Sequence, residues 1–341
     1  MKNQLQERSG KRITLCLDAR MYRHSGIGRY IRHQVNSLLC DDAYELILLV
    51  PKGGIDELKE VRQIEFNSPI YSLWEQVLYP FVVPDCDVFW SPHYNVPFLP
   101  VRAKKRWVTI HDLYHLRFKD QLGFFKKWYA RIFFSAACRM SNRIITVSQF
   151  SKNELLSFFD VEDKLEVILN ETDQIFYEKK YTEQDLQQVL RNYNIDFPYV
   201  LFVGNLKPHK NLITLLKAFE KIMNDFSLLK LVVVGKETGF LTEDYETKLY
   251  LDKNTALKKR VLFTGPVADE ELPALYSAAK VFVFPSLYEG FGYPPLEAHL
   301  SGTKVLCSNA GPMPEVCGNR VTYFDPLDVD QLSDLLKNNL D

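Results

Sequence analysis

The sequence has no cysteine pair with the spacing of a metal site and no apolar segment long enough to cross a membrane. Its six cysteines are scattered and none belongs to a C-x-x-C pair, so we expect buried, reduced thiols instead of disulfides. No stretch reaches about eighteen uninterrupted apolar residues, and the polar N-terminus lacks the apolar core of a signal peptide. We therefore expect a cytoplasmic protein that does not span a membrane.

An excess of charge of either sign is also missing. The net charge is −1, from 42 Lys and Arg against 43 Asp and Glu, whereas proteins that bind nucleic acid usually carry a basic excess. Nucleic acid is therefore not an expected partner. With 341 residues, of which 46% are hydrophobic, the chain exceeds one ordinary core, which predicts two globular domains with a ligand site between them.

Short apolar runs alternate with segments of helical spacing, which predicts βαβ units and two parallel sheets. The strands predicted in the first half are 12–19, 45–50, 87–90, 106–110, 143–147 and 165–169. Those predicted in the second half are 199–204, 230–235, 260–265, 281–285, 304–308 and 321–324. A polar stretch without strand-like runs separates the two sets. We therefore expect domains over 1–172 and 198–341, joined by a linker over 173–197.

A glycine-rich loop, Ser25-Gly26-Ile27-Gly28-Arg29-Tyr30, follows the first predicted strand. Two glycines allow backbone N–H groups to approach an anion at the positive end of the next helix, so Gly26, Gly28 and Arg29 are candidates for phosphate binding. A tight turn that needs small residues explains the glycines equally well. A dinucleotide fingerprint is excluded, because Ile31 stands where it requires a third glycine.

The second domain has a basic loop between its first strand and a helix with Leu and Phe at helical spacing. The loop Gly204-Asn205-Leu206-Lys207-Pro208-His209-Lys210-Asn211 places two lysines just before a helix N-terminus. Cations there are unfavourable to the helix dipole by a few tenths of a kcal/mol to about 1 kcal/mol. We therefore expect an anion to bind Lys207 or Lys210, since this edge of an open parallel sheet is where ligands bind.

The most informative stretch follows a predicted strand near the C-terminus. Glu289 lies in a glycine-rich loop with Gly290, Phe291 and Gly292, and Glu297 lies on the helix that Pro294 and Pro295 begin. Two carboxylates at this edge can accept hydrogen bonds from the hydroxyls of a hexose and of a ribose.

These features together resemble the retaining glycosyltransferases of family 4, which have the GT-B fold and two glutamates separated by seven residues, as Glu289 and Glu297 are. Further blocks are similar to that family in the same order: Asp18-Ala19-Arg20, SGIGRY, Trp74-Glu75-Gln76, Ser91-Pro92-His93, Thr109-Ile110-His111-Asp112-Leu113, Thr146-Val147-Ser148 and GNLKPHKN. The resemblance covers nearly the whole chain. It implies an α/β protein of two Rossmann-like, doubly wound parallel-sheet domains with the active site in the cleft between them.

The resemblance also implies roles for individual residues. Glu289 would contact the donor hexose, Glu297 the ribose, and Lys210 the diphosphate, which Gly26 and Gly28 would approach from the first domain. His111 would position the transferred sugar. Many members have an arginine where Asn205 stands, which leaves more of the phosphate charge to Lys210, with Lys207 or His209.

The branch most similar to this chain includes bacterial mannosyltransferases of surface-polysaccharide synthesis. This implies transfer of mannose from GDP-mannose to a saccharide or lipid-linked saccharide, without metal or cofactor. We discount Asp85-Cys86-Asp87 as a D-x-D metal motif, because it precedes its strand. Two alternatives share the architecture, a nucleotide-sugar 2-epimerase and a catalytically silent nucleotide-sugar-binding subunit.

Two further features remain. The resemblance implies about another helix pair after a helix such as 331–340, so we expect a truncated C-terminal domain, a naturally short form or an inactive relative. The segment 124–139 mixes aromatic residues with Lys126, Lys127, Arg131 and Arg139, as a helix on the inner membrane face would. A helix half buried in the first domain is the competing interpretation.

Overall fold

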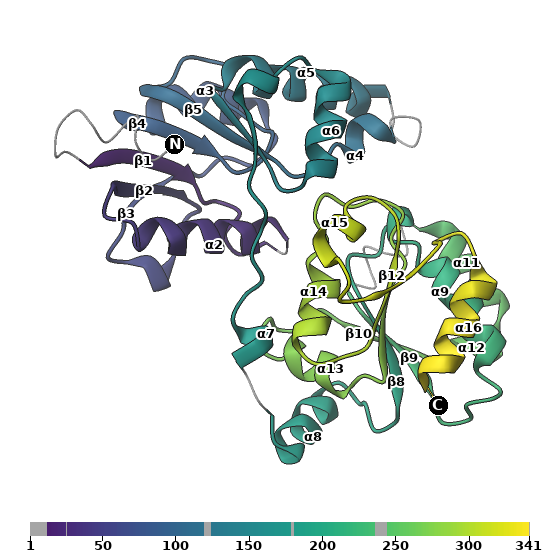
Figure 1. Cartoon of the computed structure of the whole chain (residues 1–341). Coiled ribbons are helices and arrows are strands. Elements are labelled where there is room, and N and C mark those ends of the chain that lie inside the picture. The colour runs from purple at the N-terminus through teal and green to yellow at the C-terminus, as the bar shows by residue number, and fades with distance from the viewer. Residues whose placement is uncertain (1–11, 25, 119–123, 179–180, 236–243, 341) are drawn as a thin grey trace. The chain divides into compact units, whose positions relative to one another are not determined.

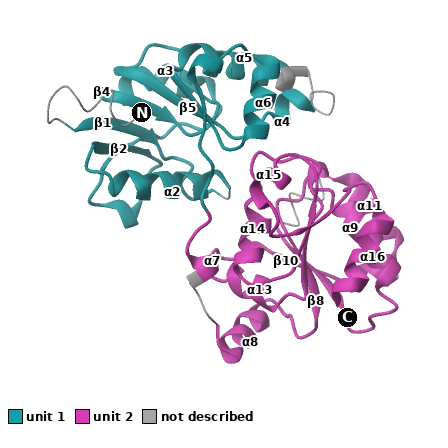
Figure 2. Cartoon of the chain, in the orientation of Figure 1, with its two compact units in different colours: residues 1–171 teal, residues 172–341 magenta. Residues whose placement is uncertain are grey.

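The chain forms two compact units, residues 1–171 and residues 172–341, in a computed structural model (Figures 1 and 2). The structure describes residues 12–24, 26–118, 124–178, 181–235 and 244–340. Ser25 of the glycine-rich loop and the side chains of Lys126 and Lys127 lie outside the described residues. Each unit is built around its own parallel sheet.

Within its described residues, unit 1 has a seven-stranded parallel sheet in the order β3-β2-β1-β4-β5-β6-β7. Its strands are β1 (Ile13–Asp18), β2 (Tyr44–Val50), β3 (Arg62–Glu65), β4 (Cys86–Ser91), β5 (Ala103–Ile110), β6 (Arg143–Thr146) and β7 (Leu165–Val167). Its helices are α2 (Ile27–Leu39), α3 (Leu73–Val82), α4 (Tyr114–Arg117), α5 (Phe124–Met140) and α6 (Gln149–Phe158), with 3₁₀ turns at Asp56–Leu58 and Glu162–Lys164. The strand order reverses between β1 and β4, where Leu15 pairs with Val88.

Serine side chains begin two helices of unit 1. The hydroxyl of Ser72 accepts a hydrogen bond from the N–H of Glu75 at the start of α3, and that of Ser148 accepts one from Ser151 at the start of α6. Each bond satisfies a backbone donor that the helix leaves without an internal partner. The short polar sequences before the two helices therefore fix where they begin.

In the described part of unit 2, a six-stranded parallel sheet has the order β10-β9-β8-β11-β12-β13. Its strands are β8 (Tyr199–Val203), β9 (Lys230–Val234), β10 (Val261–Gly265), β11 (Val281–Phe284), β12 (Val305–Ser308) and β13 (Thr322–Phe324). Its helices are α7 (Ile175–Glu178), α8 (Glu183–Asn192), α9 (Leu212–Ile222), α11 (Tyr245–Lys253), α12 (Thr255–Lys258), α13 (Leu272–Ala278), α14 (Tyr293–Leu300), α15 (Met313–Cys317) and α16 (Val329–Leu340), with a 3₁₀ turn at Pro208–Lys210. The reversal falls between β8 and β11, as in doubly wound nucleotide-binding folds.

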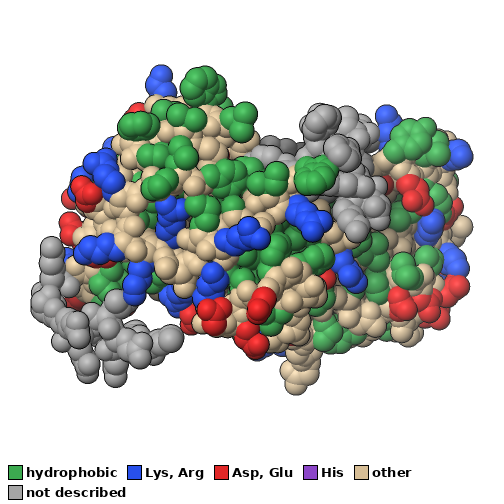
Figure 3. Space-filling view, turned by 90° about the horizontal axis from the view of Figure 1, so that it is seen from above, with side chains coloured by type: hydrophobic (Ala, Val, Ile, Leu, Met, Phe, Trp, Pro, Cys, Tyr) green, Lys and Arg blue, Asp and Glu red, His purple; other side chains and the backbone are tan. Residues whose placement is uncertain are grey.

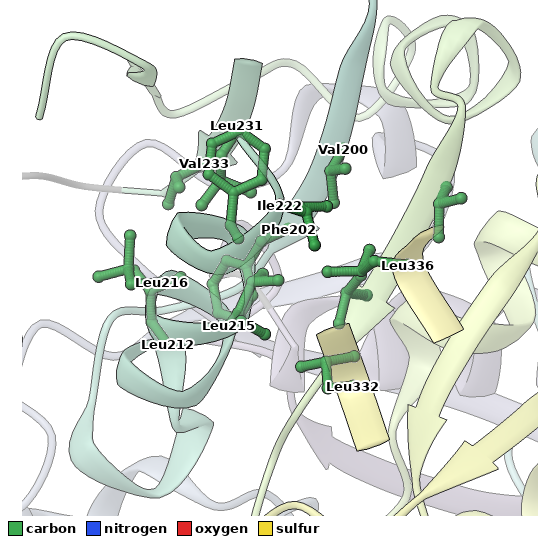
Figure 4. Packing of buried hydrophobic residues seen from close by; sticks show 14 of the residues in the cluster. Val200, Phe202, Leu212, Leu215, Leu216, Ile222, Leu231, Val233, Leu332 and Leu336 are labelled. Carbon is green, nitrogen blue, oxygen red and sulfur yellow. The ribbon is translucent and has the colours of Figure 1, made fainter. Parts of the chain in front are cut away.

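The core of unit 2 lies on both faces of its sheet. On one face, α9 and α16 cover the strands, and Leu212, Leu215 and Leu216 meet Leu332 and Leu336 beneath them (Figure 4). On the other face, α13 and α14 pack with Phe282 and Phe284 in a second cluster. Because both faces are covered, the strands are apolar throughout, and this made them predictable from sequence.

Residues 173–197, expected as a linker, contribute to unit 2. Phe176 of α7, Leu190 of α8 and Ile195 are buried in the same cluster as β8 and α13. Helix α8 begins with a reciprocal capping box between Thr182 and Asp185. The described residues of this stretch therefore contribute to the core of unit 2, although most of its residues are polar.

Every predicted strand is present, with ends that differ by about three residues or fewer. The sequence did not predict β3, an edge strand of sequence Arg-Gln-Ile-Glu with only Ile64 as an apolar residue. The strand is defined by its backbone pairing with β2, in which Ile64 lies opposite Leu49, because its side chains form no apolar pattern. In the described part of the chain, no helix is both long and apolar enough to cross a membrane.

Candidate functional site

Two loops meet at the carboxyl edge of the sheet in unit 2, where its strand order reverses. The loop after β8 carries Lys210, and the loop after β11 carries Glu289. Nζ of Lys210 lies 2.6 Å from Oε1 of Glu289, and the two side chains are only 16% and 12% exposed. The structure thus brings together two predicted site residues that are far apart in sequence, as a partly buried ion pair.

Backbone and amide contacts fasten the two loops to each other. The N–H of Leu287 donates to the carbonyl of His209 at 2.7 Å. Nδ2 of the buried Asn211 donates to the carbonyl of Pro285 at 3.0 Å and to that of Pro326 at 2.8 Å. Asn211 has a φ of 55°, a left-handed conformation that asparagine tolerates better than most residues. This role of Asn211 was not predicted from the sequence.

Two polar residues of the basic loop point to solvent, whereas His209 is half-buried. Asn205 and Lys207 are exposed, and the N–H of Lys207 donates to the carbonyl of Asn205 at 3.0 Å. Lys207 has no ion-pair partner among the residues that the structure describes. Of the two predicted lysines, the structure places Lys210 against a carboxylate and leaves Lys207 in water.

A left-handed glycine begins α14. Gly292 has a φ of 91°, and a Cβ there would lie 2.2 Å from Cε and 2.8 Å from Sδ of Met313. Neither the conformation nor the space suits another residue. Gly290 and Phe291 are buried beside it, and the Phe291 ring packs edge-on against Tyr293. The glycines that the sequence singled out therefore shape this turn.

Glu297 is buried on α14. The hydroxyl of Tyr276, on α13, donates to Oε2 of Glu297 at 3.1 Å. A carboxylate on the protein surface would merely complement the helix dipole, whereas a buried one needs hydrogen-bond donors. Glu297 is therefore held in the interior of unit 2, and sequence reasoning did not identify Tyr276 as its partner.

In unit 1, the two predicted glycines have different surroundings. Gly26 has a φ of 67° and nothing within 4 Å of where a Cβ would lie. At Gly28 a Cβ would lie 2.6 Å from the carbonyl oxygen of Tyr22 and 3.0 Å from that of Met21. The close approach at Gly28 is thus to the chain's own backbone, and Arg29 follows it, half-buried, on α2.

His111 follows β5 and contacts both α2 and the end of β4. Its Nε2 lies 2.8 Å from the carbonyl oxygen of Pro92, which can only accept, so this nitrogen carries the proton. The ring packs edge-on against Tyr30, with centroids 4.7 Å apart. Burial lowers the pKa of His111, which favours the neutral ring with a lone pair on Nδ1. His111 can therefore accept a hydrogen bond at Nδ1.

A buried ionic cluster at the end of β1 was missed from the sequence. The guanidinium of Arg20 binds Asp18 through Nε at 2.8 Å and Nη2 at 2.5 Å, and its Nη2 also lies 2.5 Å from Oε1 of Glu75. Tyr79 donates to Asp18 at 2.9 Å, and Phe66 covers the guanidinium at 4.2 Å. Burial alone would raise the pKa of Asp18, but the ion pair with Arg20 outweighs it and lowers that pKa.

The cluster joins three sequence blocks that had been noted without a role. Asp18 and Arg20 come from the end of β1, Glu75 from α3, and Asn95 follows the Ser91-Pro92-His93 block and donates to Glu75 at 2.6 Å. His93 is buried in the same region, and burial lowers its pKa to about 4. The sequence could have suggested a buried ionic cluster, because the charged residues of these blocks stand among apolar ones.

The Asp85-Cys86-Asp87 triplet forms ordinary contacts at the start of β4. Asp87 accepts from the N–H of Thr14 at 3.0 Å and pairs with Lys104 at 2.6 Å, and Asp85 lies 3.9 Å from Arg102. Among the described residues, no group of three or more His, Cys, Asp or Glu side chains has the arrangement of a metal site.

The strand orders of the two units define an α/β protein of two Rossmann-like domains, the architecture of the GT-B class. Solved structures share this fold. Sucrose-phosphate synthase from Thermosynechococcus elongatus superposes with a TM-score of 0.74 at 18% identity, covering 97% of this chain and 90% of the other. The Anabaena protein HepE, in complex with UDP and glucose, gives 0.74 at 19% identity, covering 95% and 89%. The predicted fold class is confirmed.

Two sequence families match almost all of the chain. Residues 24–173 match Glycosyltransferase Family 4, and residues 186–341 match Glycosyl transferases group 1. The chain belongs to this family of glycosyltransferases and is therefore a transferase of glycosyl groups.

Two curated relatives align over most of their length. O-antigen chain mannosyltransferase B of Escherichia coli is 28% identical, over 94% of this chain and 88% of the relative. O-antigen chain mannosyltransferase RfbU of Salmonella typhimurium is 29% identical, over 79% and 69%.

Proposed function

We propose that this protein is a retaining, metal-independent mannosyltransferase that transfers mannose from GDP-mannose to a saccharide or lipid-linked saccharide of a bacterial surface polysaccharide. The relatives that align over most of the chain are named as O-antigen mannosyltransferases, which supports the sugar and the class of acceptor. Neither the epimerase nor the silent subunit is favoured by them. The transfer needs no cofactor, since the donor is already activated.

The observation that carries the proposal is the Lys210–Glu289 pair at the strand-order reversal of unit 2. A diphosphate at this edge would meet the ammonium of Lys210 and the backbone N–H groups of the glycine-rich turn before α14, since Pro294 and Pro295 in the first turn of the helix have none. The carboxylate of Glu289 would accept hydrogen bonds from the hexose hydroxyls. The pair therefore places a cation for the leaving group beside an acceptor for the sugar.

In the proposed reaction, the bond between the anomeric carbon and the diphosphate oxygen breaks while Lys210 and loop N–H groups stabilise the departing diphosphate. The acceptor hydroxyl attacks the anomeric carbon from the face that the leaving group vacates and gives its proton to the departing diphosphate oxygen, so the anomeric configuration is retained without an enzyme nucleophile. In unit 1, the Nδ1 lone pair of His111 would accept a hydrogen bond from the donor sugar, and the loop of Gly26, Gly28 and Arg29 would approach the phosphates.

Glu297 is proposed to bind the ribose through the carboxylate oxygens that Tyr276 orients. Such a contact forms equally in the ground state and the transition state, so its loss raises the donor KM more than it lowers kcat. The buried position of Glu297 agrees with a site that holds its ligand away from water.

A thermal-shift screen tests the donor. GDP, UDP and ADP, each with its mannose and glucose conjugates, are compared without metal, in excess chelator, and then with magnesium. UDP belongs in the screen because HepE, with a similar fold, is solved with UDP. We expect GDP-mannose to raise the melting temperature most, in chelator as in magnesium. A shift that requires magnesium, or one confined to another base, would overturn the donor and metal assignments.

Product analysis tests the reaction. Mannose transferred from α-linked GDP-mannose should appear in an α-linkage by NMR, as retention requires, and a β-linkage would contradict it. Incubation with donor alone should leave the sugar's C2 configuration unchanged. An epimerised nucleotide sugar there would instead establish the epimerase.

A further inference from the structure

Helix α3 of unit 1 exposes most of its apolar side chains and buries its polar ones together with Tyr79. Glu75 and Gln76 are buried, whereas Leu73, Trp74 and Phe81 are 83%, 71% and 75% exposed. Val77 and Leu78 are exposed on the same helix. A surface helix of a globular protein normally has the reverse arrangement.

Buried polar contacts fix this orientation. Oε1 of Glu75 binds Arg20 at 2.5 Å and its Oε2 accepts from Asn95 at 2.6 Å. Oε1 of Gln76 accepts from the N–H of Phe98 at 2.9 Å. Turning the apolar face inward would break a buried ion pair and leave its charges without partners, which is strongly unfavourable. These buried contacts therefore hold the apolar face of α3 towards the outside of unit 1.

The apolar surface continues from α3 to α5. Phe98, which binds Gln76 of α3, packs its ring against Phe133 of α5 with centroids 4.5 Å apart. Leu99 beside it is exposed, as are Trp128 and Ile132 on α5. Beyond these residues lies an open groove of about 990 Å³ whose lining includes Phe98, Trp128, Arg131, Arg139 and Lys164, together with the acidic Asp160. We name this the α3–α5 surface.

Basic side chains accompany the apolar ones on this surface. The segment of α5 contains no acidic residue, and the one carboxylate of α3, Glu75, is buried. Arg131 and Arg139 are exposed, and neither has an acidic partner among the described residues. Figure 3 looks onto the side on which α3 and α5 lie in Figure 1, and shows hydrophobic and basic side chains gathered over unit 1, with acidic ones mostly at its margins.

We propose that the α3–α5 surface docks unit 1 onto an anionic lipid bilayer. Exposed Trp and Phe side chains insert at the boundary between headgroups and acyl chains, and arginines beside them bind the anionic headgroups. The absence of exposed carboxylates from α3 and α5 suits a negatively charged surface. This docking is independent of the proposed donor and acceptor, because binding to a vesicle requires neither.

Flotation of the full chain with vesicles tests the proposal, using phosphatidylcholine alone and phosphatidylcholine mixed with phosphatidylglycerol. We expect binding to the mixed vesicles only. The pair Trp74→Gln/Phe81→Gln should lower the partition constant at least about tenfold, since burying each side chain is worth about 1.5–3 kcal/mol. Arg131→Gln/Arg139→Gln should lower it about tenfold, and by progressively less as salt is raised. The matched control is Leu228→Gln/Leu327→Gln, at comparably exposed positions of unit 2.

Equal binding by the α3 pair and the control, or no binding of the unaltered protein to mixed vesicles, would overturn the proposal. Light scattering tests whether the surface is instead an interface between two copies of the chain. A dimer that the α3 pair converts to monomer, with vesicle binding unchanged, would assign the surface to a second copy. Thermal shift with GDP-mannose reports the donor site in the same samples, so a failure of docking is distinguished from a failure of the proposed function.

Discussion

Lys210 and Glu289 form a 2.6 Å ion pair that ties the loop after β8 to the loop after β11. Each is the other's neutralising partner while the site holds no diphosphate. A donor would therefore exchange a carboxylate for a diphosphate at the ammonium of Lys210, and the two residues can be tested separately.

Replacing Lys210 with alanine should lower kcat by about a hundredfold, because one electrostatic donor aimed at developing charge is worth roughly 3–4 kcal/mol. Steady-state kinetics with saturating donor measures the change. Lys253→Ala, on the exposed face of α11, is the control and should leave kcat unaltered. A loss of about tenfold or less would remove Lys210 from this role.

Glu289→Gln should separate binding from turnover. Removing the carboxylate frees Lys210, so GDP should bind about two- to fivefold more tightly, the gain expected from a partly exposed pair worth about 0.5–1 kcal/mol. The transfer rate should fall at least about tenfold, because the hexose loses its acceptor. Calorimetry with GDP and kinetics with the donor give the two values, with Glu246→Gln as the control. Weaker GDP binding would show that Glu289 does not compete for Lys210.

Arg20→Met should destabilise unit 1 by about 3–5 kcal/mol, because it leaves Asp18 and Glu75 buried without a cation. Denaturation in urea, followed by circular dichroism, measures the free energy of unfolding. Arg12→Met removes an exposed arginine from its pair with Asp42 and should cost less than about 1 kcal/mol. Similar losses in both variants would mean that the buried cluster contributes no more than a surface pair.

Stability should fall as the pH drops from about 6.5 to about 4. Burial lowers the pKa of His93 from 6.5 to about 4, so within this window the unfolded chain binds more protons than the folded one. The contribution is complete above the unfolded pKa and is lost on acidification, by about 3 kcal/mol in total. The lowered pKa of His111 also makes stability fall on acidification. The lowered pKa of Asp18 has the same effect, but at pH values below its unfolded pKa of 3.8.

The pH dependence can be assigned by substitution. Urea midpoints measured across the window should show a smaller slope in His93→Gln than in the unaltered protein. His299→Gln, on α14 of unit 2, should retain the full slope. An unchanged slope in His93→Gln would place the proton uptake on other residues.

The sequence predicted the sheets well because the strands are buried on both faces and read as apolar runs. It missed β3, whose only apolar residue is Ile64, because an edge strand is defined by its backbone pairing. Residues 173–197 looked like a linker because the few core residues, such as Phe176 and Leu190, stand among many polar ones. Composition averages over such residues, whereas packing depends on each of them.

The candidate site was predictable where motifs have fixed spacing and unpredictable where contacts join distant segments. The stretch from Glu289 to Glu297 was found from its own sequence, but its pairing with Lys210 and the support from Asn211 follow from the fold. The ionic cluster of Arg20 and Glu75 combines two blocks whose proximity depends on the strand order. The proposed ligand roles rest on the motifs, and the experiments above test them.

The strand-order reversals also have a consequence for how the chain folds. At the reversals, Leu15 pairs with Val88 in unit 1 and Leu201 pairs with Phe282 in unit 2. In each unit, two other strands and their connections lie between the paired strands in the sequence. Such pairings require closure of long loops before they gain contacts, and they slow folding. Each of these carboxyl edges therefore forms only when the two halves of its sheet come together, so the candidate site residues reach their places only after this long-range pairing.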